Sequence, residues 1–327
     1  MEYERIGQFE KAAEGYQETI RLDPKMAIAY GNLAFVYVEL DRFDEGKAIC
    51  QRALAQGFDA SILHGALLLI AYLQKDAPAI GREAIWFRGK PEEFHVKQGE
   101  AEAAAQAGQW GKAEEYARQA ADMARQRKLS PQAGLLLAGF ALGRAEAGLC
   151  QDVRGRIREA LGLNREAAGP AAAALALCGQ AAEAEVLAVE MQKRLPTDTI
   201  NNAVQIPAIR AIIALKANQP ARALELLQSA APYERANGGV IYGRGVAHLQ
   251  MEAGAEAMAD FQNLLDHKGA YMNWNALARV GLARAAAIAG DKAKSLRAYQ
   301  DFLALWKDGD PDVPLLQDAK REYARLQ

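Results

Sequence analysis

The chain has 327 residues, with 39 lysines and arginines against 41 aspartates and glutamates, so its net charge is −2. Because the two signs are interspersed and nearly balanced, the sequence offers no electrostatic footprint for DNA, RNA or an anionic bilayer, and we expect no nucleic-acid partner. The longest apolar stretch, residues 61–73, is too short to span a bilayer. No basic segment with an apolar leader precedes it, so we expect a cytoplasmic chain without direct membrane insertion.

The composition favours helices. Proline is scarce at 11 residues, and alanine runs such as residues 171–174 are good helix formers. Clusters of β-branched residues bounded by turns, which would indicate strands, are missing from the sequence. We therefore expect an all-α fold.

The three cysteines are odd in number, far apart in the sequence and placed at helix-packing positions. Such cysteines behave as small hydrophobic side chains in a reducing compartment. We therefore predict that Cys50, Cys150 and Cys178 are all buried and unpaired.

Residues 7–24 form the first recognisable element, an amphipathic helix followed by its breaker. Ala12 is small, Tyr16 follows one turn later, and Pro24 ends the helix, as in the second helix of a two-helix repeat. The same offsets recur 34 residues later at Gly46, Cys50 and Phe58.

The first helix of the next unit has an aromatic-x-x-Leu-small-x-x-Tyr pattern, carried by Tyr30, Leu33, Ala34 and Tyr37. Further along, a small or apolar residue recurs at the helix contact of each unit, at intervals of 31 to 40 residues. These contact residues define nine units, the first incomplete, and they are Ala12, Gly46, Ile80, Ala113, Val153, Ala184, Ala223, Ala257 and Ser295. The longest intervals predict longer helices or loops over residues 196–207 and 267–275.

This pattern resembles the tetratricopeptide family over nearly the whole chain, most strongly over residues 7–90. The resemblance implies a right-handed superhelical α-solenoid of about nine helix pairs with a C-terminal capping helix. Within one continuous solenoid, we expect regular units over residues 1–90, divergent units over 91–195, units with longer connections over 196–307 and the capping helix over 308–327. The positions that pack the repeats are Ala12, Tyr16, Tyr30, Leu33, Ala34, Tyr37, Gly46, Ala113, Ala184, Ala223, Ala257 and Tyr299.

The two ends of the array differ. Asp310 is placed as the cap of the last helix, with Pro311 in its first turn. At the front, the apolar face of Ala12, Ala13 and Tyr16 lacks a full partner, because too little chain precedes it. We therefore expect more chain upstream in the natural protein.

Signatures of chemistry are weak. The four histidines are isolated in the sequence, and no metal-binding or nucleotide-binding motif is complete. The pair Gly243 and Gly245 lacks the rest of a dinucleotide fingerprint and predicts a tight helix crossing. The sequence therefore predicts no enzyme, no metal and no cofactor; a helical-toroid enzyme is a remote alternative.

The resemblance implies a concave groove lined by first helices, which in this family holds an extended peptide or a helix. Helical spacing places eleven residues there: Asn32, Phe35, Leu69, Tyr72, His95, Gln98, Glu102, Leu142, Ile212, Leu215 and Val246. These positions are apolar enough that either a partner covers them or they pack internally. A second hypothesis is a small-molecule sensor whose ligand is selected near Asn201, Asn202, Gln205, Tyr271, Asn273 and Trp274.

The closing segment, residues 290–327, resembles the C-terminal end of repeat regions in bacterial, often acidobacterial, serine/threonine protein kinases. No kinase motif is present in these residues, so any kinase activity would lie outside them. The resemblance implies a scaffold whose partner is a protein or peptide, or a catalytic domain of the same polypeptide.

Overall fold

The computed structural model describes residues 2–327, and these contain helices and turns but no strand. The helices from α3 to α18 form hairpins, while the short α1 (Glu2–Arg5) precedes the second helix of an incomplete unit and α19 (Pro314–Leu326) stands alone at the other end. The first helices of the hairpins are α3 (Ala27–Glu39), α5 (Ser61–Gln74), α7 (Phe94–Gln106), α9 (Ser130–Glu146), α11 (Ala168–Leu177), α13 (Ile206–Lys216), α15 (Gly238–Gln250) and α17 (Asn275–Ile288). The second helices are α2 (Phe9–Leu22), which follows α1, then α4 (Phe43–Ala55), α6 (Ala77–Phe87), α8 (Trp110–Gln126), α10 (Val153–Leu163), α12 (Ala181–Arg194), α14 (Pro220–Leu227), α16 (Gly254–Asp266) and α18 (Lys292–Leu305).

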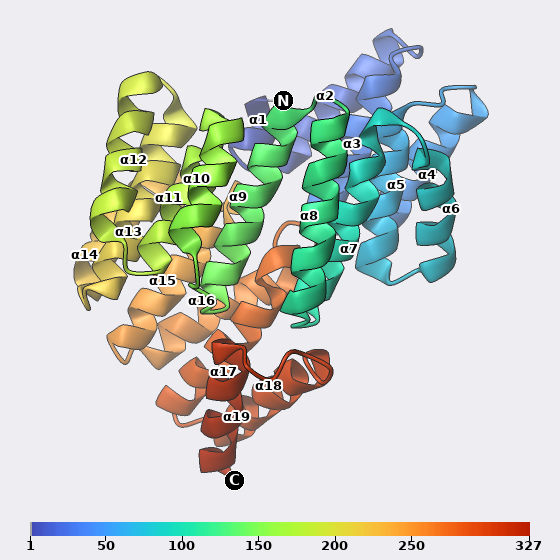
Figure 1. Cartoon of the computed structure of the whole chain (residues 1–327). Helices are drawn as coiled ribbons and strands as arrows, with labels where there is room; N and C mark the ends of the chain where they lie inside the picture. The colour runs from blue at the N-terminus through green and yellow to red at the C-terminus, as the bar shows by residue number, and fades with distance from the viewer. Residues whose placement is uncertain (1) are drawn as a thin grey trace.

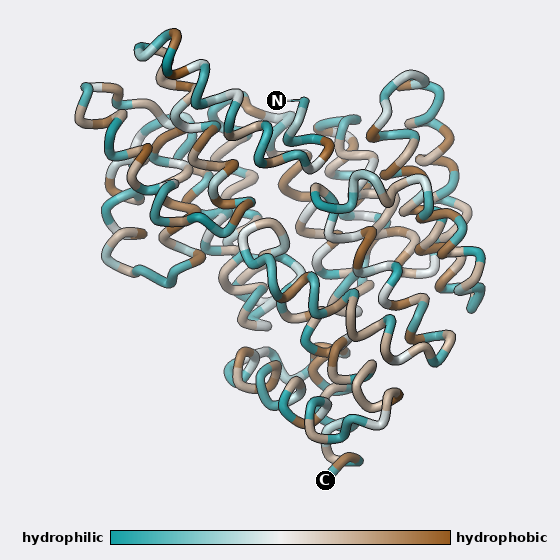
Figure 2. Tube along the Cα trace, turned by 180° about the vertical axis from the view of Figure 1, so that it is seen from behind, coloured by the Kyte–Doolittle hydropathy of each residue, from teal (hydrophilic) through white to brown (hydrophobic). Residues whose placement is uncertain are grey.

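The hairpins stack into an α-solenoid, which confirms the predicted all-α class (Figure 1). The apolar side chains form several separate clusters along the stack, because each hairpin buries its apolar stripe against its neighbours. Figure 2 accordingly shows hydrophobic residues distributed along all the hairpins and not gathered at one centre.

Each second helix starts at a fixed distance from its contact residue. Ala12, Gly46 and Ala113 are each the fourth residue of their helix, as are Ile80, Ala184, Ala223, Ala257 and Ser295. The exception is Val153, which is the first residue of α10 because the preceding turn extends to Asp152, at a φ of 54°. The small residues lie where two helix axes cross closely, and Ala113, Ala184 and Ala223 are fully buried.

The longer connections fold into short helical turns. These are η1 (Pro91–Glu93), η2 (Arg165–Ala167), the π-helical turn η3 (Asn201–Gln205), η4 (Gln228–Ala236) and η5 (Met272–Trp274). The predicted glycine crossing is also present, because a Cβ on Gly245 would lie 2.8 Å from the ring of Phe261 on α16.

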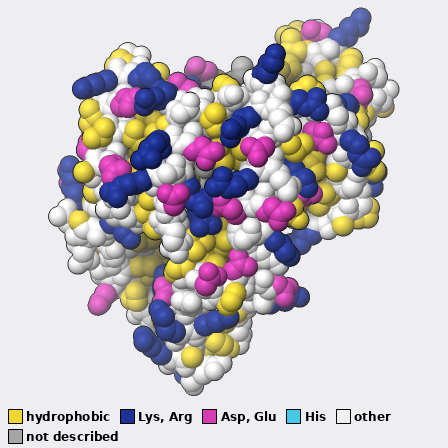
Figure 3. Space-filling model, viewed as in Figure 1, with side chains coloured by type: hydrophobic (Ala, Val, Ile, Leu, Met, Phe, Trp, Pro, Cys, Tyr) yellow, Lys and Arg dark blue, Asp and Glu magenta, His cyan; other side chains and the backbone are white. Residues whose placement is uncertain are grey.

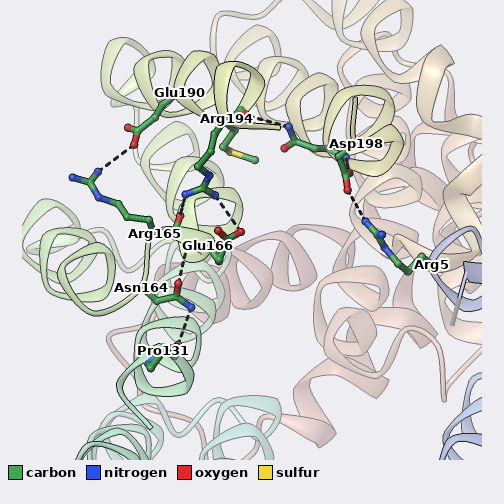
Figure 4. Close-up of polar contacts among 10 residues, drawn as sticks. Arg5, Pro131, Asn164, Arg165, Glu166, Glu190, Arg194 and Asp198 are labelled. Carbon is green, nitrogen blue, oxygen red and sulfur yellow. Dashed lines mark hydrogen bonds and ion pairs between the residues drawn. The ribbon is translucent and has the colours of Figure 1, made fainter. Parts of the chain in front are cut away.

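The array turns back on itself, so that segments about 200 residues apart are in contact. Arg5 on α1 pairs with Asp198 beyond α12 at 2.9 Å (Figure 4), and Arg235 in η4 forms two 2.9 Å hydrogen bonds to the Glu10 carboxylate. The amide of Gly269 donates to the Asp41 carboxylate at 2.7 Å. The N-terminal hairpins are therefore joined to the later ones.

This closure gives the apolar face at the front of the array a partner that the sequence did not show. Ala12 and Ala13 are only 4% and 3% exposed, and the apolar cluster around them includes Ala236 from η4. The Arg235 side chain also lies over the Phe9 ring. The apolar face that the sequence left unpartnered is thus covered by a segment more than 200 residues further along the chain.

The C-terminal end also differs from expectation. Asp310 does not cap the last helix: its carboxylate accepts a 2.8 Å hydrogen bond from the amide of Gly111, in the first turn of α8. α19 begins at Pro314, so Pro311 lies outside it. We call residues 306–315 the C-terminal arm; it lies against α8 and α9, and Leu315 donates from its amide to the Ala147 carbonyl at 3.4 Å.

The prediction of three unpaired cysteines is wrong. Cys150 and Cys178 form a disulfide with a Cα–Cα distance of 5.5 Å, and Cys50 alone is free and buried. The disulfide joins the turn after α9 to the turn after α11, so two successive hairpins bring together cysteines that are 28 residues apart. Stacking of neighbouring turns, which sequence distance hides, produces this pairing.

Candidate functional site

A cavity of about 750 Å³ opens where the stack is interrupted. Each first helix packs closely on the next one along the stack except at α7 and α9, which are held apart. On the face shown in Figure 3, hydrophobic side chains gather where the α8–α10 layer meets the C-terminal helices. The cavity is bounded by α7, α9, the start of α17 and the C-terminal arm.

Bulky side chains between α7 and α9 explain the gap. Trp110, at the start of α8, packs 5.9 Å from the Phe140 ring of α9, measured between ring centroids. Gly143 faces the same indole, since a Cβ there would lie 3.4 Å from it. Phe140 and Gly143 fall within the long, 40-residue interval between Ala113 and Val153.

The C-terminal arm closes the remaining side. Trp306 is only 3% exposed, and its Nε1 donates to the Gln106 carbonyl of α7 at 3.0 Å. The Gln106 side chain in turn donates to the Asn273 carbonyl at 3.2 Å. The C-terminal arm and the end of α7, about 200 residues apart in the chain, therefore form one wall.

Four of the eleven predicted groove residues line the cavity: His95, Gln98, Glu102 and Leu142. Tyr72 instead packs against the α7 backbone at Gly99 and donates to the Val96 carbonyl at 3.3 Å. The half-buried Asn32, Phe35 and Leu69 lie on α3 and α5, and Ile212, Leu215 and Val246 pack into the clusters of the later hairpins.

Two of the residues proposed for a small-molecule site also line the cavity, namely Asn273 and Trp274. The others have structural contacts elsewhere. Asn201 is buried and donates to the Met191 carbonyl at 3.2 Å, and Asn202 donates to the Leu195 carbonyl at 2.8 Å. Gln205 is exposed at the end of η3, and Tyr271 packs in the core beneath α15 and α17.

The charges that line the cavity are acidic. Glu92, Glu102 and Glu146 face it, and no lysine or arginine is among its lining residues. Burial raises the pKa of Glu146 to about 8, and burial also raises the pKa of Glu102 despite a 2.9 Å hydrogen bond from Gln98. These carboxylates thus sit where ionisation is unfavourable without a cation.

Sequence reasoning missed Glu146, although a signal for it existed. Glu146 lies four residues after Leu142 on α9, and residues at that spacing share one helix face. Trp110 and Trp306 were missed for a different reason. Trp110 is placed by its packing against Phe140 of α9, and Trp306 by the arm, from which its indole N–H reaches the Gln106 carbonyl of α7.

One of the four histidines that are isolated in the sequence, His64, lies in a polar cluster outside the cavity. His64 Nδ1 lies 2.6 Å from the Glu83 carboxylate and Nε2 lies 2.9 Å from that of Asp59, while the ring stacks on Trp86. Burial raises the pKa of the nearby Cys50 thiol to about 12, so that thiol is no nucleophile at neutral pH. Over residues 2–327, no group of three or more His, Cys, Asp or Glu side chains could hold a metal ion.

Among the helices described, none is both long and apolar enough to cross a membrane.

Residues 7–69 match the family model for the tetratricopeptide repeat, which is the stretch where the 34-residue period is most regular. No curated protein sequence matches the chain. Among solved structures, the crystal structure of yeast Tom70 is similar at a TM-score of 0.36 and 14% identity, covering 99% of this chain and 86% of that chain.

Proposed function

We propose that the chain is a non-catalytic interaction module that holds a peptide or protein segment in the cavity between α7, α9 and the C-terminal arm. The observation that carries this proposal is the cavity itself, whose walls are largely first helices, the surface that binds ligands in helical-repeat arrays. Its lining is mostly apolar with a few polar groups, which is typical of a binding site.

The module is proposed to belong to a larger signalling protein of the kinase type that residues 290–327 resemble. The bound segment then comes from a separate protein or from a catalytic domain of the same polypeptide.

The cellular compartment is part of the same proposal. The Cys150–Cys178 disulfide favours an oxidising environment over the cytoplasm expected from the sequence. Labelling of free thiols in freshly lysed cells distinguishes the two.

The experiment is a selection of peptides from a random dodecapeptide phage library, followed by measurement of their affinity for variants. Leu135 lines the cavity and is 46% exposed, so Leu135→Asp changes the site without opening a core. Val186, 66% exposed on α12, provides the matched control Val186→Asp. We expect Leu135→Asp alone to weaken binding by tenfold or more; equal loss in both variants, or no selected peptide, would contradict the proposal.

A second candidate, a small-molecule sensor, is favoured by one observation. The volume of about 750 Å³ falls within the range of small-ligand pockets, and Asn273 and Trp274 line it. A thermal-shift screen of metabolite mixtures tests this candidate. A stabilising compound whose effect disappears in Leu135→Asp but not in Val186→Asp would support it over a peptide.

A further inference from the structure

The C-terminal arm ends on the short turn between α9 and α10. Leu315 donates from its amide to the Ala147 carbonyl at 3.4 Å. Gly148 approaches the arm so closely that a Cβ there would lie 2.9 Å from Cβ of Pro314. Ala147 and Val313 belong to the same apolar cluster. The last residues of the arm therefore depend on this turn for their docking.

The other end of the arm is held by the turn between α7 and α8. There the Asp310 amide donates to the Gly108 carbonyl at 3.0 Å, and Trp306 packs on the same turn. Trp306 and Leu315 both line the cavity. The arm is thus a strap between two turns, and loss of either anchor would open the cavity.

The α9–α10 turn has a backbone that is costly to maintain. Gly148 and Asp152 both have left-handed φ values, 85° and 54°. Within residues 2–327 this is the one turn between consecutive helices that has two such residues. A residue with a Cβ, such as Asp152, adopts this conformation only where its surroundings hold it there. The turn therefore needs an external support.

The Cys150–Cys178 disulfide supplies that support. Cys150 lies between the two left-handed residues, and its sulfur is bonded to Cys178 in the turn after α11. A cross-link between two turns restricts the conformations that each of them can reach. The disulfide and the arm therefore act on the same short segment from opposite sides.

The disulfide lies where a small thiol can reach it. Cys150 and Cys178 are half-buried, and the neighbouring Gly148 and Gly179 are exposed. A thiolate of a dithiol attacks one sulfur and forms a mixed disulfide, which the second thiol of the reductant then resolves. Two electrons and two protons pass to the cysteines, leaving two thiols, and the dithiol becomes a disulfide.

From this arrangement, we propose that the Cys150–Cys178 disulfide is a redox latch on the cavity: the intact bond holds the α9–α10 turn and the docked arm, and its reduction by a dithiol releases the arm. The inference goes beyond the proposed function, because it concerns how the cavity opens and not what the cavity binds. It applies to the chain whether the occupant is a peptide or a small molecule.

The first test is hydrogen exchange of the full chain, measured by mass spectrometry at short labelling times with and without dithiothreitol. Thiol titration under the same conditions establishes that the disulfide is reduced. We expect exchange over residues 308–315 to become at least about tenfold faster on reduction, because local opening frees the Asp310 and Leu315 amides. The helix α3, with Tyr30 and Leu33 fully or almost fully buried, should stay protected and is the internal control.

The second test is quenching of tryptophan fluorescence by acrylamide in a Trp86→Phe background. The three tryptophans that remain all line the cavity. Dithiothreitol should raise the quenching constant to that of a variant that also carries Cys150→Ser and Cys178→Ser. Reductant should leave this variant unchanged, although it retains the free Cys50.

Three results would overturn the inference. Faster exchange in α3 and in the arm alike would mean that reduction only destabilises the fold. Unchanged exchange over residues 308–315 would mean that the arm does not depend on the disulfide. A disulfide that dithiothreitol cannot reduce in the folded chain would be structural and no latch.

These results do not depend on the serine variant or on the proposed function. If the doubly substituted chain fails to fold, exchange in the wild type with and without reductant still decides the question. Failure of the phage selection bears on the proposed function alone, since neither test uses a bound peptide.

Discussion

The contact between the α7–α8 turn and the C-terminal arm can be measured with a pair of matched glycines. Gly108 and Gly290 both follow a first helix, and their φ values are 74° and 79°. A Cβ on Gly290 would meet nothing within 4 Å, whereas a Cβ on Gly108 would lie 2.6 Å from Cδ2 of Trp306. The two positions therefore share the same backbone strain and differ in the contact with the arm.

Substitution by alanine should separate these two effects. The left-handed conformation costs an alanine about 1–2 kcal/mol, and this penalty applies to both variants. Gly108→Ala adds an overpacking penalty of about 1–3 kcal/mol, because the nearest atoms of Trp306 are at the root of its ring and the side chain is buried. The variant at Gly108 should thus be less stable than the variant at Gly290 by about 1–3 kcal/mol.

The assay is urea unfolding followed by far-ultraviolet circular dichroism, with tryptophan emission as a second probe of the arm. In a Trp306→Ala background the difference between Gly108→Ala and Gly290→Ala should vanish, which is the control for the contact itself. Equal destabilisation by the two substitutions in the wild-type background would refute the reasoning. It would mean that in solution the arm does not lie on the α7–α8 turn.

Three further predictions follow from contacts that link distant segments or bury charge. Serine at both Cys150 and Cys178 should destabilise the fold by about 3–4 kcal/mol, the entropy expected for a loop of 28 residues, and reductant should bring the wild type to the same urea midpoint. Asp310→Ala should destabilise the fold by about 1 kcal/mol and speed hydrogen exchange at the Gly111 amide, because it removes the carboxylate that accepts from this amide in the first turn of α8. Unchanged exchange at that amide would contradict this prediction. Burial, with repulsion from Glu4 and Asp41, raises the pKa of Glu39 to about 7 from 4.5. Between these two pH values the folded state binds more protons than the unfolded state, so the free energy of unfolding should fall by about 1–2 kcal/mol as pH rises through the interval, allowing for the partial exposure of Glu39. The variant Glu39→Gln should show a flatter dependence of stability on pH than the wild type.

The sequence by itself determined the local architecture. Two-helix units follow from a spacing that recurs within about 40 residues, and the same spacing placed contact residues such as Ala113 and Ala184 at the start of the second helices. These features depend on interactions between residues close in the chain, such as helix propensity, turn glycines and the stripe of one helix against the next. A periodic pattern records such interactions directly.

Only the tertiary structure decided how the stack closes. Three contacts join segments about 200 residues apart: Arg235 covers the front face at Glu10, Asp310 accepts from the Gly111 amide in the first turn of α8, and Trp306 closes the cavity against Gln106. Small differences in the packing angle of each hairpin add up along a solenoid, so contact between distant hairpins depends on their sum and not on any local pattern. For the same reason the sequence placed His95 and Glu102 on an inward face, but could not bring them together with Trp306.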